Sequence, residues 1–356
     1  MRAITLLPGI ANSARLDDIA EPPISDGTIL VRTLTLGVCG TDREIVSGAF
    51  GEAPPGSERL VLGHESFGEV IDAPGDSGFV KGDRIVGIVR RPDPVPCPAC
   101  AAGEWDMCRN GRYTERGIKG LDGYGAERFR IEPAFAVKVD AALGILGVLT
   151  EPTSIVAKAW AQVERIGRRS HSWRPRKLLV TGSGPIGLLA ALIGMQRGFK
   201  THILDRSADG PIPTLVRDLG ATHHAGQVSD LAGLDPDVVM ECTGAPAVIG
   251  GVMGFTAPGG IVCLLGIGGP HEIKFDVGGL NRTMVLDNNV VFGSVNANRD
   301  HYDMAADVLS RADPRWLGRL ISRRVPLERW DEALQQRPDD IKVIVDFATE
   351  SHGPGR

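Results

Sequence analysis

The sequence predicts an α/β protein of two domains, a β-rich domain and a doubly wound parallel sheet, on the strength of three observations. The chain has 356 residues, more than twice the roughly 150 residues of a typical domain. Residues 1 to 140 contain short apolar runs separated by glycine and proline turns. From about residue 177, strand-sized apolar runs alternate with helix-sized segments, which is the pattern of parallel βαβ units.

The composition is that of an ordinary globular protein, with 42% hydrophobic and 23% charged residues. The net charge of −5 gives no electrostatic reason to expect a nucleic acid or an anionic membrane as partner. No apolar run reaches the roughly 18 residues of a membrane span, and the N-terminus lacks the apolar region and cleavage site of a signal peptide. We therefore expect a cytoplasmic protein that binds neither nucleic acid nor membrane.

The two halves are separated by a basic stretch, "RIGRRSHSWRPRK", at residues 165–177. Before it, "GTILVRTLTLGVC", "GDRIVGIV" and "AFAVKVD" have the composition of strands bounded by turn residues. The basic stretch itself contains proline, and short charge runs of this kind are usually solvated. We interpret it as a linker.

The second half opens with a candidate dinucleotide site, "KLLVTGSGPIGLLAALIGMQRG", which predicts a buried strand, a glycine turn and a helix. In the GxGxxG pattern the first glycine permits the tight turn and the second lets the backbone approach a pyrophosphate. The third glycine packs the helix against the strand. This context predicts a Rossmann domain whose phosphate-binding turn consists of Gly182, Ser183, Gly184, Pro185, Ile186 and Gly187.

A second strand, "THILD", ends in Asp205, 18 residues beyond Gly187, where the acid that binds the cofactor ribose belongs. Asp205 should bind the ribose hydroxyls of NAD and repel the 2′-phosphate of NADP. Arg206 follows directly and could partly offset that repulsion by pairing with the phosphate. We predict a preference for NAD with some use of NADP.

Thiol, imidazole and carboxylate side chains at three places form a candidate metal site. Cys39 lies in "LTLGVCGTDREI", His64 and Glu65 in "LVLGHESFGEV", and Glu151 at the predicted helix start in "LTEPTSIVAKAW". These ligand types hold Zn²⁺ tetrahedrally while leaving one position for a substrate oxygen. Each residue alone also has a structural interpretation, since a lone cysteine is more often a core residue and Glu-Pro is a good helix start.

Together, the "CGTD" segment, the "GHExxG" segment and the later Rossmann pattern resemble the medium-chain, zinc-dependent alcohol and polyol dehydrogenases, from about residue 25 to 345. That resemblance implies a GroES-like catalytic domain before the Rossmann domain. It narrows to the archaeal-type glucose 1-dehydrogenases through "YTERGI" (113–118), "LTEPTSIVAKA" (149–159), the basic connector and "NNVVFGSVNANRDHY" (288–302).

The resemblance implies roles for individual side chains. The catalytic zinc site uses the positions held here by Cys39, His64, Glu65 and Glu151. Thr41 is the proton relay, and the residues given a catalytic role are Thr41, Glu65 and Glu151. The positions that contact the sugar are those of Cys39, Thr41, Glu115, Glu151 and Asn296.

Two of these positions also have a structural interpretation that involves no contact with a sugar. A charged loop residue such as Glu115 is at the surface about half the time, and Asn296 could equally be an Asx-turn residue. The resemblance favours a sugar contact for both, and it places the Asn296 loop near the nicotinamide as part of the cofactor site.

A second cysteine group, "PCPACAAGEWDMC", contains Cys97, Cys100 and Cys108. Its spacing matches the last three thiolates of the structural zinc lobe in the superfamily, but Pro94 occupies the first position. Since structural zinc is nearly always four-coordinate, a fourth ligand would have to come from elsewhere. Either a nearby acid supplies it and the lobe holds a second, structural zinc, or the lobe is metal-free. The candidate acids are Asp93, Glu104 and Asp106.

The expected organisation is a catalytic zinc-binding domain from residues 1–155 and 296–356, with the connector and Rossmann domain at 156–295. Family members are dimers or tetramers, so we expect a homodimer or homotetramer.

The expected activity is zinc-dependent transfer of a hydride from C1 of a glucose-like aldose to NAD(P)⁺, giving an aldonolactone. A polyol, an amino alcohol or a specialised sugar-like intermediate is the alternative substrate, because Val89-Arg90-Arg91 and "PDPVPC" differ from a typical glucose enzyme. Zinc-free quinone reductases of the superfamily lack Cys39 and His64-Glu65. A protein that binds dinucleotide without catalysis would have lost a metal ligand or Thr41.

Overall fold

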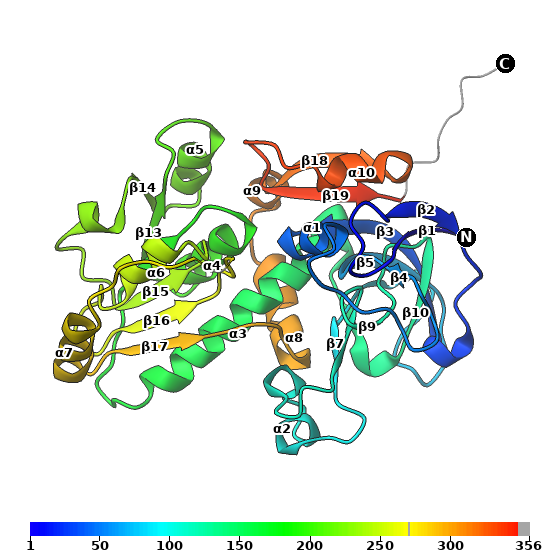
Figure 1. The fold of residues 1–356 in the computed structure, drawn as a ribbon, viewed down its shortest axis with the longest axis horizontal. Helices are drawn as coiled ribbons and strands as arrows, with labels where there is room; N and C mark the ends of the chain where they lie inside the picture. Colours follow the sequence, from blue (N-terminus) through cyan, green and yellow to red (C-terminus); the bar gives the residue numbers. More distant parts are fainter. Residues whose placement is uncertain (270, 348–356) are drawn as a thin grey trace. The chain divides into compact units, whose positions relative to one another are not determined.

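The computed structural model describes residues 1–269 and 271–347, and the chain divides into two compact units (Figure 1). Unit 1 contains Met1–Ser154 and the chain from Asn296 onward, and unit 2 contains Ile155–Val295. The helix α3 (Thr150–Gly167) runs from the end of the first segment of unit 1 into unit 2.

Unit 1 is built on an antiparallel sheet around the long strand β3 (Ile29–Val38). Its strand order is β11-β6-β5-β3-β19-β18, and β10 pairs with a further part of β3. The bounds are β5 Glu65–Asp72, β6 Arg84–Gly87, β10 Arg128–Ile131, β11 Ala136–Lys138, β18 Ile321–Pro326 and β19 Lys342–Asp346. The sheet therefore combines the N-terminal strands with two strands from the end of the described chain, and within it only β18 and β19 pair in parallel.

Two small sheets complete the strands of unit 1. One has the order β2-β1-β4, with bounds β1 Arg2–Leu6, β2 Arg15–Asp18 and β4 Leu60–Val61. The other has the order β7-β8-β9, with bounds β7 Arg90–Arg91, β8 Thr114–Arg116 and β9 Gly120–Leu121. The core between the sheets is apolar and fully buried, including Ile4, Leu36, Ile85 and Tyr124.

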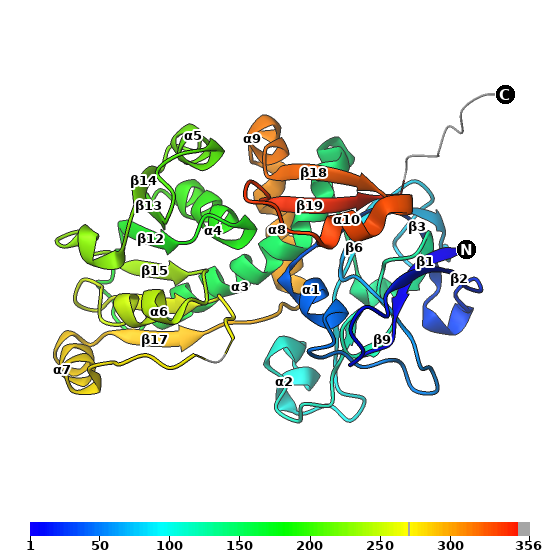
Figure 2. The ribbon, with the colours of Figure 1, turned by 45° about the horizontal axis from the view of Figure 1, so that its top comes forward.

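The helices of unit 1 are short. They are α1 Gly40–Val46, α2 Pro98–Ala101, α8 Arg299–Ser310, α9 Pro314–Gly318 and α10 Trp330–Leu334. Figure 2 shows α10 beside the paired strands β18 and β19. The strand β19 pairs with β3 in the antiparallel sense, so the end of the described chain adds a strand to the sheet of unit 1.

Unit 2 is a six-stranded, all-parallel sheet with strand order β14-β13-β12-β15-β16-β17. In chain order this is 3-2-1-4-5-6, the arrangement of a dinucleotide-binding Rossmann sheet. The bounds are β12 Lys177–Thr181, β13 Lys200–Asp205, β14 Thr222–Ala225, β15 Val238–Glu241, β16 Ile261–Leu264 and β17 Val290–Gly293, with helices α4 Pro185–Gln196, α5 Pro211–Asp218, α6 Pro246–Val252 and α7 Val277–Asp287. The predicted fold class is confirmed.

One helical stretch, Ala141–Gly167, is long and apolar enough to meet the length and composition criteria of a membrane span. However, 72% of its apolar window is buried inside the protein, as expected of a helix that packs in a core. The basic stretch overlaps the end of this helix at residues 165–167, and residues 168–172 beyond it are exposed, in agreement with a solvated segment. It lies within unit 2, so it does not mark the boundary between the two units as predicted.

Candidate metal and dinucleotide sites

The thiol of Cys39 is positioned by the junction of β3 and α1. Cys39 is the N-cap residue of α1, and its backbone N–H donates to Oδ2 of Asp42 at 2.9 Å. Asp42 is 1% exposed, so this carboxylate is held inside the protein within the first turn of the helix. The turn fixes the direction in which the half-buried Cys39 side chain leaves the sheet.

His64 faces Cys39. Gly63 adopts φ +98°, which a residue with a side chain rarely adopts, and leads from β4 into His64. Nε2 of His64 lies 3.1 Å from Sγ of Cys39, and Nδ1 lies 3.2 Å from Oδ1 of Asp42. Asp42 therefore orients the imidazole from behind, as carboxylates orient metal-binding histidines.

The electrostatics of this pair are dominated by burial and by neighbouring charge. Burial by itself lowers the pKa of His64, but the charges of Asp42 and Cys39 outweigh it and raise the pKa well above its usual value. Burial likewise opposes ionisation of Asp42, yet the charge of His64 leaves the pKa of that carboxyl below its usual value. The neighbouring Asp42 and Cys39 side chains thus favour the protonated form of the His64 imidazole.

Glu65 begins β5 and is 2% exposed. Nζ of Lys342, on β19, donates to both carboxylate oxygens at 2.7 and 2.6 Å. Gly37 lies opposite Glu65 in the β3–β5 register, and a Cβ at Gly37 would lie 2.0 Å from Oε2 of Glu65. The absence of a side chain at this one position makes room for the carboxylate.

Donor atoms of Cys39, His64 and Glu65 all lie within 4.8 Å of one another, so the structure brings these three predicted ligands together. Glu151, at the start of α3, is 6% exposed but lies outside that group of described residues. Burial raises the pKa of Glu151 to about 8, and the charge of Glu65 adds to the effect. Thr41 is half-buried in the first turn of α1, and its relay role stays a prediction.

The residues present fit a zinc ion. They supply a thiol, an imidazole and carboxylates, which are the ligand types of catalytic zinc sites. Three buried acids interact electrostatically here, and both burial and the like charges of Glu65 and Asp42 disfavour ionisation of the third, Glu151. A divalent cation would relieve that penalty.

Glu115 and Asn296, predicted to contact the sugar, are hydrogen-bonded to each other. Nδ2 of Asn296 donates to Oε1 of Glu115 at 2.6 Å, and Arg90 donates to the same oxygen. Asn296 has φ +62°, a conformation that asparagine tolerates better than most residues. The sequence thus pointed to two residues that are neighbours in unit 1, although 181 positions separate them.

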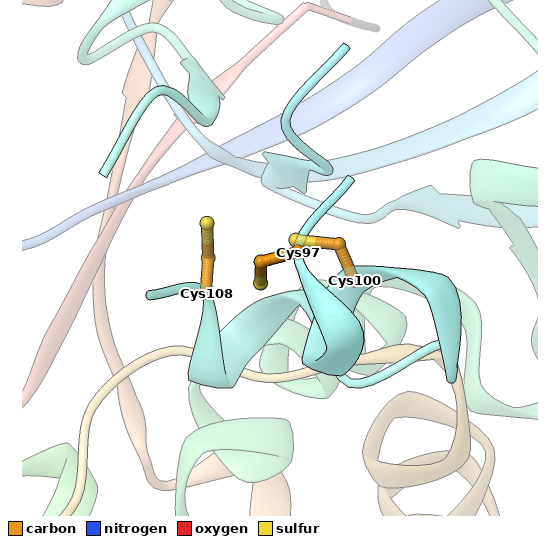
Figure 3. Close-up of side chains that lie close together, drawn as sticks. All are labelled: Cys97, Cys100 and Cys108. Atoms are coloured by element: carbon orange, nitrogen blue, oxygen red, sulfur yellow. The ribbon is translucent and has the colours of Figure 1, made fainter. Parts of the chain in front are cut away.

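The second cysteine group is shown in Figure 3, where Cys97 and Cys100 flank the start of α2 and Cys108 follows a short 3₁₀ turn. The three sulfur atoms lie within 4.8 Å of one another, and no other described His, Cys, Asp or Glu joins them. Asp93 accepts hydrogen bonds from the backbone of Val95 and from Arg112. The backbone N–H of Arg109 lowers the pKa of Cys97 to about 6.

The glycine turn of unit 2 has the predicted geometry. Gly182 has φ +88°, Gly184 is the N-cap of α4, and a Cβ at Gly187 would lie 1.9 Å from the carbonyl oxygen of Gly182. Asp205 ends β13, and its carboxylate accepts from the hydroxyl of Ser183 and from the backbone N–H of Arg206. The turn and the acid therefore lie side by side, as binding of an adenosine ribose requires.

Comparison with known proteins decides the family. Residues 25–141 match the alcohol dehydrogenase GroES-like domain, and residues 144–347 match the glucose dehydrogenase C-terminus. Glucose 1-dehydrogenase 2 of Vulcanisaeta moutnovskia is 38% identical, with 98% of this chain and 99% of that protein covered. The chain belongs to the glucose 1-dehydrogenase family. Within this family, the glucose 1-dehydrogenase of Thermoproteus tenax is 39% identical over 98% of this chain and all of that one.

A solved structure also matches the present chain over nearly its whole length. The glucose dehydrogenase of Haloferax mediterranei, in complex with NADP, Zn and gluconolactone, has a TM-score of 0.90 and 31% identity. The match covers 98% of this chain and 100% of that chain. The predicted membership of the zinc-dependent medium-chain superfamily is confirmed.

The sequence analysis did not predict the roles of three residues that contact the site residues. Asp42 could have been found, because an acid three residues after an N-cap is a known capping signal. Lys342 carries no local signal, since it is a single cation in an apolar strand, and Arg90 stands out only as one of two adjacent arginines, which does not indicate its partner. Their partners become visible only once the strands are paired.

Proposed function

We propose that this chain is a zinc-dependent dehydrogenase that oxidises C1 of a glucose-like aldose with NAD(P)⁺ and releases an aldonolactone. The observation that carries the proposal is the group formed by Cys39, His64 and Glu65, in a chain that belongs to the glucose 1-dehydrogenase family. The Haloferax mediterranei relative, in complex with NADP, Zn and gluconolactone, supports the same substrate class.

In this proposal Cys39, His64, Glu65 and Glu151 would hold the catalytic zinc ion. A bound zinc ion supplies Lewis acidity toward a hydroxyl oxygen. Asp42 keeps Nε2 of His64 directed at the metal position, and Lys342 neutralises Glu65 until the metal is present.

The remaining residues act on the sugar. Thr41, two residues after Cys39, accepts the hydroxyl proton of the reacting carbon and passes it toward solvent. Glu115 and Asn296 bind ring hydroxyls and hold C1 in place, which is the main contribution a protein makes to hydride transfer. Glu151, buried and of raised pKa, hydrogen-bonds the sugar at the metal side.

The cofactor preference proposed is for NAD over NADP. The carboxylate of Asp205 lies beside the glycine turn and would repel a 2′-phosphate, whereas exposed Arg206 would attract one. Asp205→Asn should therefore improve kcat/KM for NADP⁺ relative to NAD⁺. If wild-type enzyme used NADP⁺ as efficiently as NAD⁺, the preference would be overturned.

A second zinc ion is proposed in the lobe of Cys97, Cys100 and Cys108. Three thiols within 4.8 Å fit a thiophilic ion, and since no described acid or histidine joins them, the fourth ligand would be a solvent molecule. Two zinc ions per chain, falling to one in Cys100→Ser, would support this. One zinc ion per chain that is lost in Cys39→Ala would remove it.

We also propose a homodimer or homotetramer in the cytoplasm. The helix α7, which precedes the edge strand β17 in the chain, has no buried residue and exposes Val277, Val285 and Leu286. All six cysteines are free, which suits a reducing compartment. Light scattering of the purified protein tests the assembly, and a monomer would contradict it.

The experiment for the activity is formation of reduced nicotinamide on a panel of aldoses, polyols and simple alcohols, before and after chelation and zinc add-back. Zinc-dependent turnover on an aldose, with an aldonolactone as product, supports the proposal. Turnover on polyols alone would keep the metal chemistry and discard the sugar. Dinucleotide binding without any turnover would indicate a non-catalytic protein.

A further inference from the structure

Arg90 is a buried cation that the proposed reaction does not use. It lies on β7, directly opposite Glu115 of β8 in the antiparallel register, and is 6% exposed. Its guanidinium stacks on the ring of Tyr113 with Cζ 3.7 Å from the centroid, and Nη1 donates to the backbone oxygen of Asp106 at 3.3 Å. A face and an edge of the guanidinium are thus fixed by protein contacts.

The free edge of that guanidinium points at Glu115. Nε and Nη2 of Arg90 donate to Oε1 of Glu115 at 3.0 and 2.9 Å, and Nδ2 of Asn296 donates to the same oxygen at 2.6 Å. An arginine commonly binds both oxygens of a carboxylate. Here three donors converge on Oε1, and within residues 1–269 and 271–347 Oε2 accepts no hydrogen bond.

This asymmetry has a chemical consequence. Glu115 is 12% exposed at its side chain, and a carboxylate withdrawn from water keeps its charge and its orientation only when a cation and donors hold it. Arg90 provides both, because its own position is fixed by Tyr113 and Asp106. The second oxygen is left as an acceptor in a fixed direction, suited to a neutral hydroxyl group.

We propose that Arg90 is a positioning residue for substrate: it holds Glu115 by Oε1 so that Oε2 accepts a hydrogen bond from one hydroxyl of the sugar. The inference rests on the proposed function, because it assumes that the substrate is an aldose. It adds that specificity for that hydroxyl depends on a residue that does not touch the sugar.

The test compares glucose with its monodeoxy derivatives. In wild-type enzyme one derivative, the one that lacks the hydroxyl bound by Oε2, should have a kcat/KM about 10- to 100-fold below that of glucose, as for loss of one hydrogen bond to a charged group. In Arg90→Met this ratio should fall below about 3-fold, with KM for glucose raised about 10-fold or more and kcat changed much less. Arg90→Lys should recover part of the ratio.

The chain offers a matched control in Arg91. It is the next residue of β7, is 7% exposed, and stacks on Phe135 with Cζ 4.0 Å from the ring centroid. Its side chain bonds to Ile88 and Glu132 and not to Glu115. Arg91→Met removes an equally buried cation from the same strand, so a general effect on folding or charge would appear in both variants.

Glu115→Gln separates the two oxygens. An amide oxygen can keep the bonds from Arg90 and Asn296 while the outward group becomes a neutral NH₂ donor in place of a charged acceptor, so the deoxy ratio should fall as in Arg90→Met. If Arg90→Met fails to fold, Arg90→Lys and Glu115→Gln carry the comparison.

Two results would overturn the inference in different ways. Normal wild-type turnover on glucose with an unchanged deoxy ratio in Arg90→Met or Arg90→Lys would refute the role of Arg90 and leave the proposed function intact. No turnover on any aldose by the zinc-loaded wild-type enzyme would refute the proposed function, and the inference with it.

Discussion

Replacing Lys342 by methionine tests whether this lysine compensates the buried charge of Glu65 at the candidate metal site. Lys342 and Glu65 are 2% and 3% exposed at their side chains, and Nζ lies 2.6 and 2.7 Å from the two carboxylate oxygens. Methionine keeps most of the volume but leaves a buried carboxylate near Cys39 and Glu151 without its cation. Breaking a buried pair in this way costs about 3–5 kcal/mol.

For a unit of this size, a loss of that magnitude corresponds to a fall in melting temperature of roughly 6–20 °C. The assay is thermal unfolding of zinc-free and zinc-loaded protein. The loss should be smaller in the zinc-loaded protein, since a divalent cation also compensates the charge of Glu65. Adding Glu65→Leu to Lys342→Met should recover part of the stability of the zinc-free protein, because the uncompensated charge is removed.

Arg324 is the control for this prediction. It is on β18, next to β19, and pairs with Asp346, but its side chain is 58% exposed. Because solvent screens such a pair, Arg324→Met should cost at most about 1 kcal/mol. If Lys342→Met destabilised the zinc-free protein no more than Arg324→Met, the argument that Lys342 compensates a buried carboxylate would be wrong.

Three further predictions concern the metal, the cofactor and pH. Cys39→Ala should lose one zinc ion per chain by elemental analysis and nearly all turnover, while dinucleotide binding measured by fluorescence titration stays within about 3-fold; retained zinc-free turnover would exclude the mechanism. Gly187→Val should abolish dinucleotide binding, because a Cβ would lie 1.9 Å from the oxygen of Gly182; unchanged affinity would refute the turn geometry. Burial lowers the pKa of His202 to about 4, and its Nδ1 lies 2.9 Å from Nε2 of His224. The unfolded chain therefore binds a proton between about pH 6.5 and 4 that the folded chain does not, so stability should fall as the pH drops through that window, by on the order of 2 kcal/mol. Chemical denaturation should show that the free energy of unfolding of His202→Leu depends less on pH than that of the wild type. An equal slope in both proteins would contradict the assignment of this pH dependence to His202.

Much of the candidate site could be predicted because its signals are local. The strand, turn and helix around Gly182 to Gly187 occupy one continuous segment, and each glycine has a steric reason that holds wherever the motif occurs. Cys39 at a strand end and His64 after a glycine are recognisable in the same way. The prediction for Glu115 and Asn296 depended on resemblance, since neither residue type indicates a sugar contact by itself.

The cysteine lobe shows where local spacing stops being informative. The spacing of Cys97, Cys100 and Cys108 predicted three neighbouring sulfur atoms, and the structure has them within 4.8 Å. Which acid would join them could not be read from the chain, because Asp93, Glu104 and Asp106 are all close in sequence. Only folding showed that Asp93 is already engaged with Val95 and Arg112 and that no described acid lies in the group.

The sequence by itself determined the parallel sheet, the dinucleotide turn and the chemical types of the metal ligands, because these depend on periodicity and on residues a few positions apart. Only the tertiary structure decided which cations pair with the acidic residues of the candidate sites. Lys342 reaches Glu65 across 277 positions, and Arg90 meets Glu115 through strand pairing. The physical reason is that a buried charge requires a partner in space, and a lysine or arginine in a strand has the same local sequence whether or not it has one.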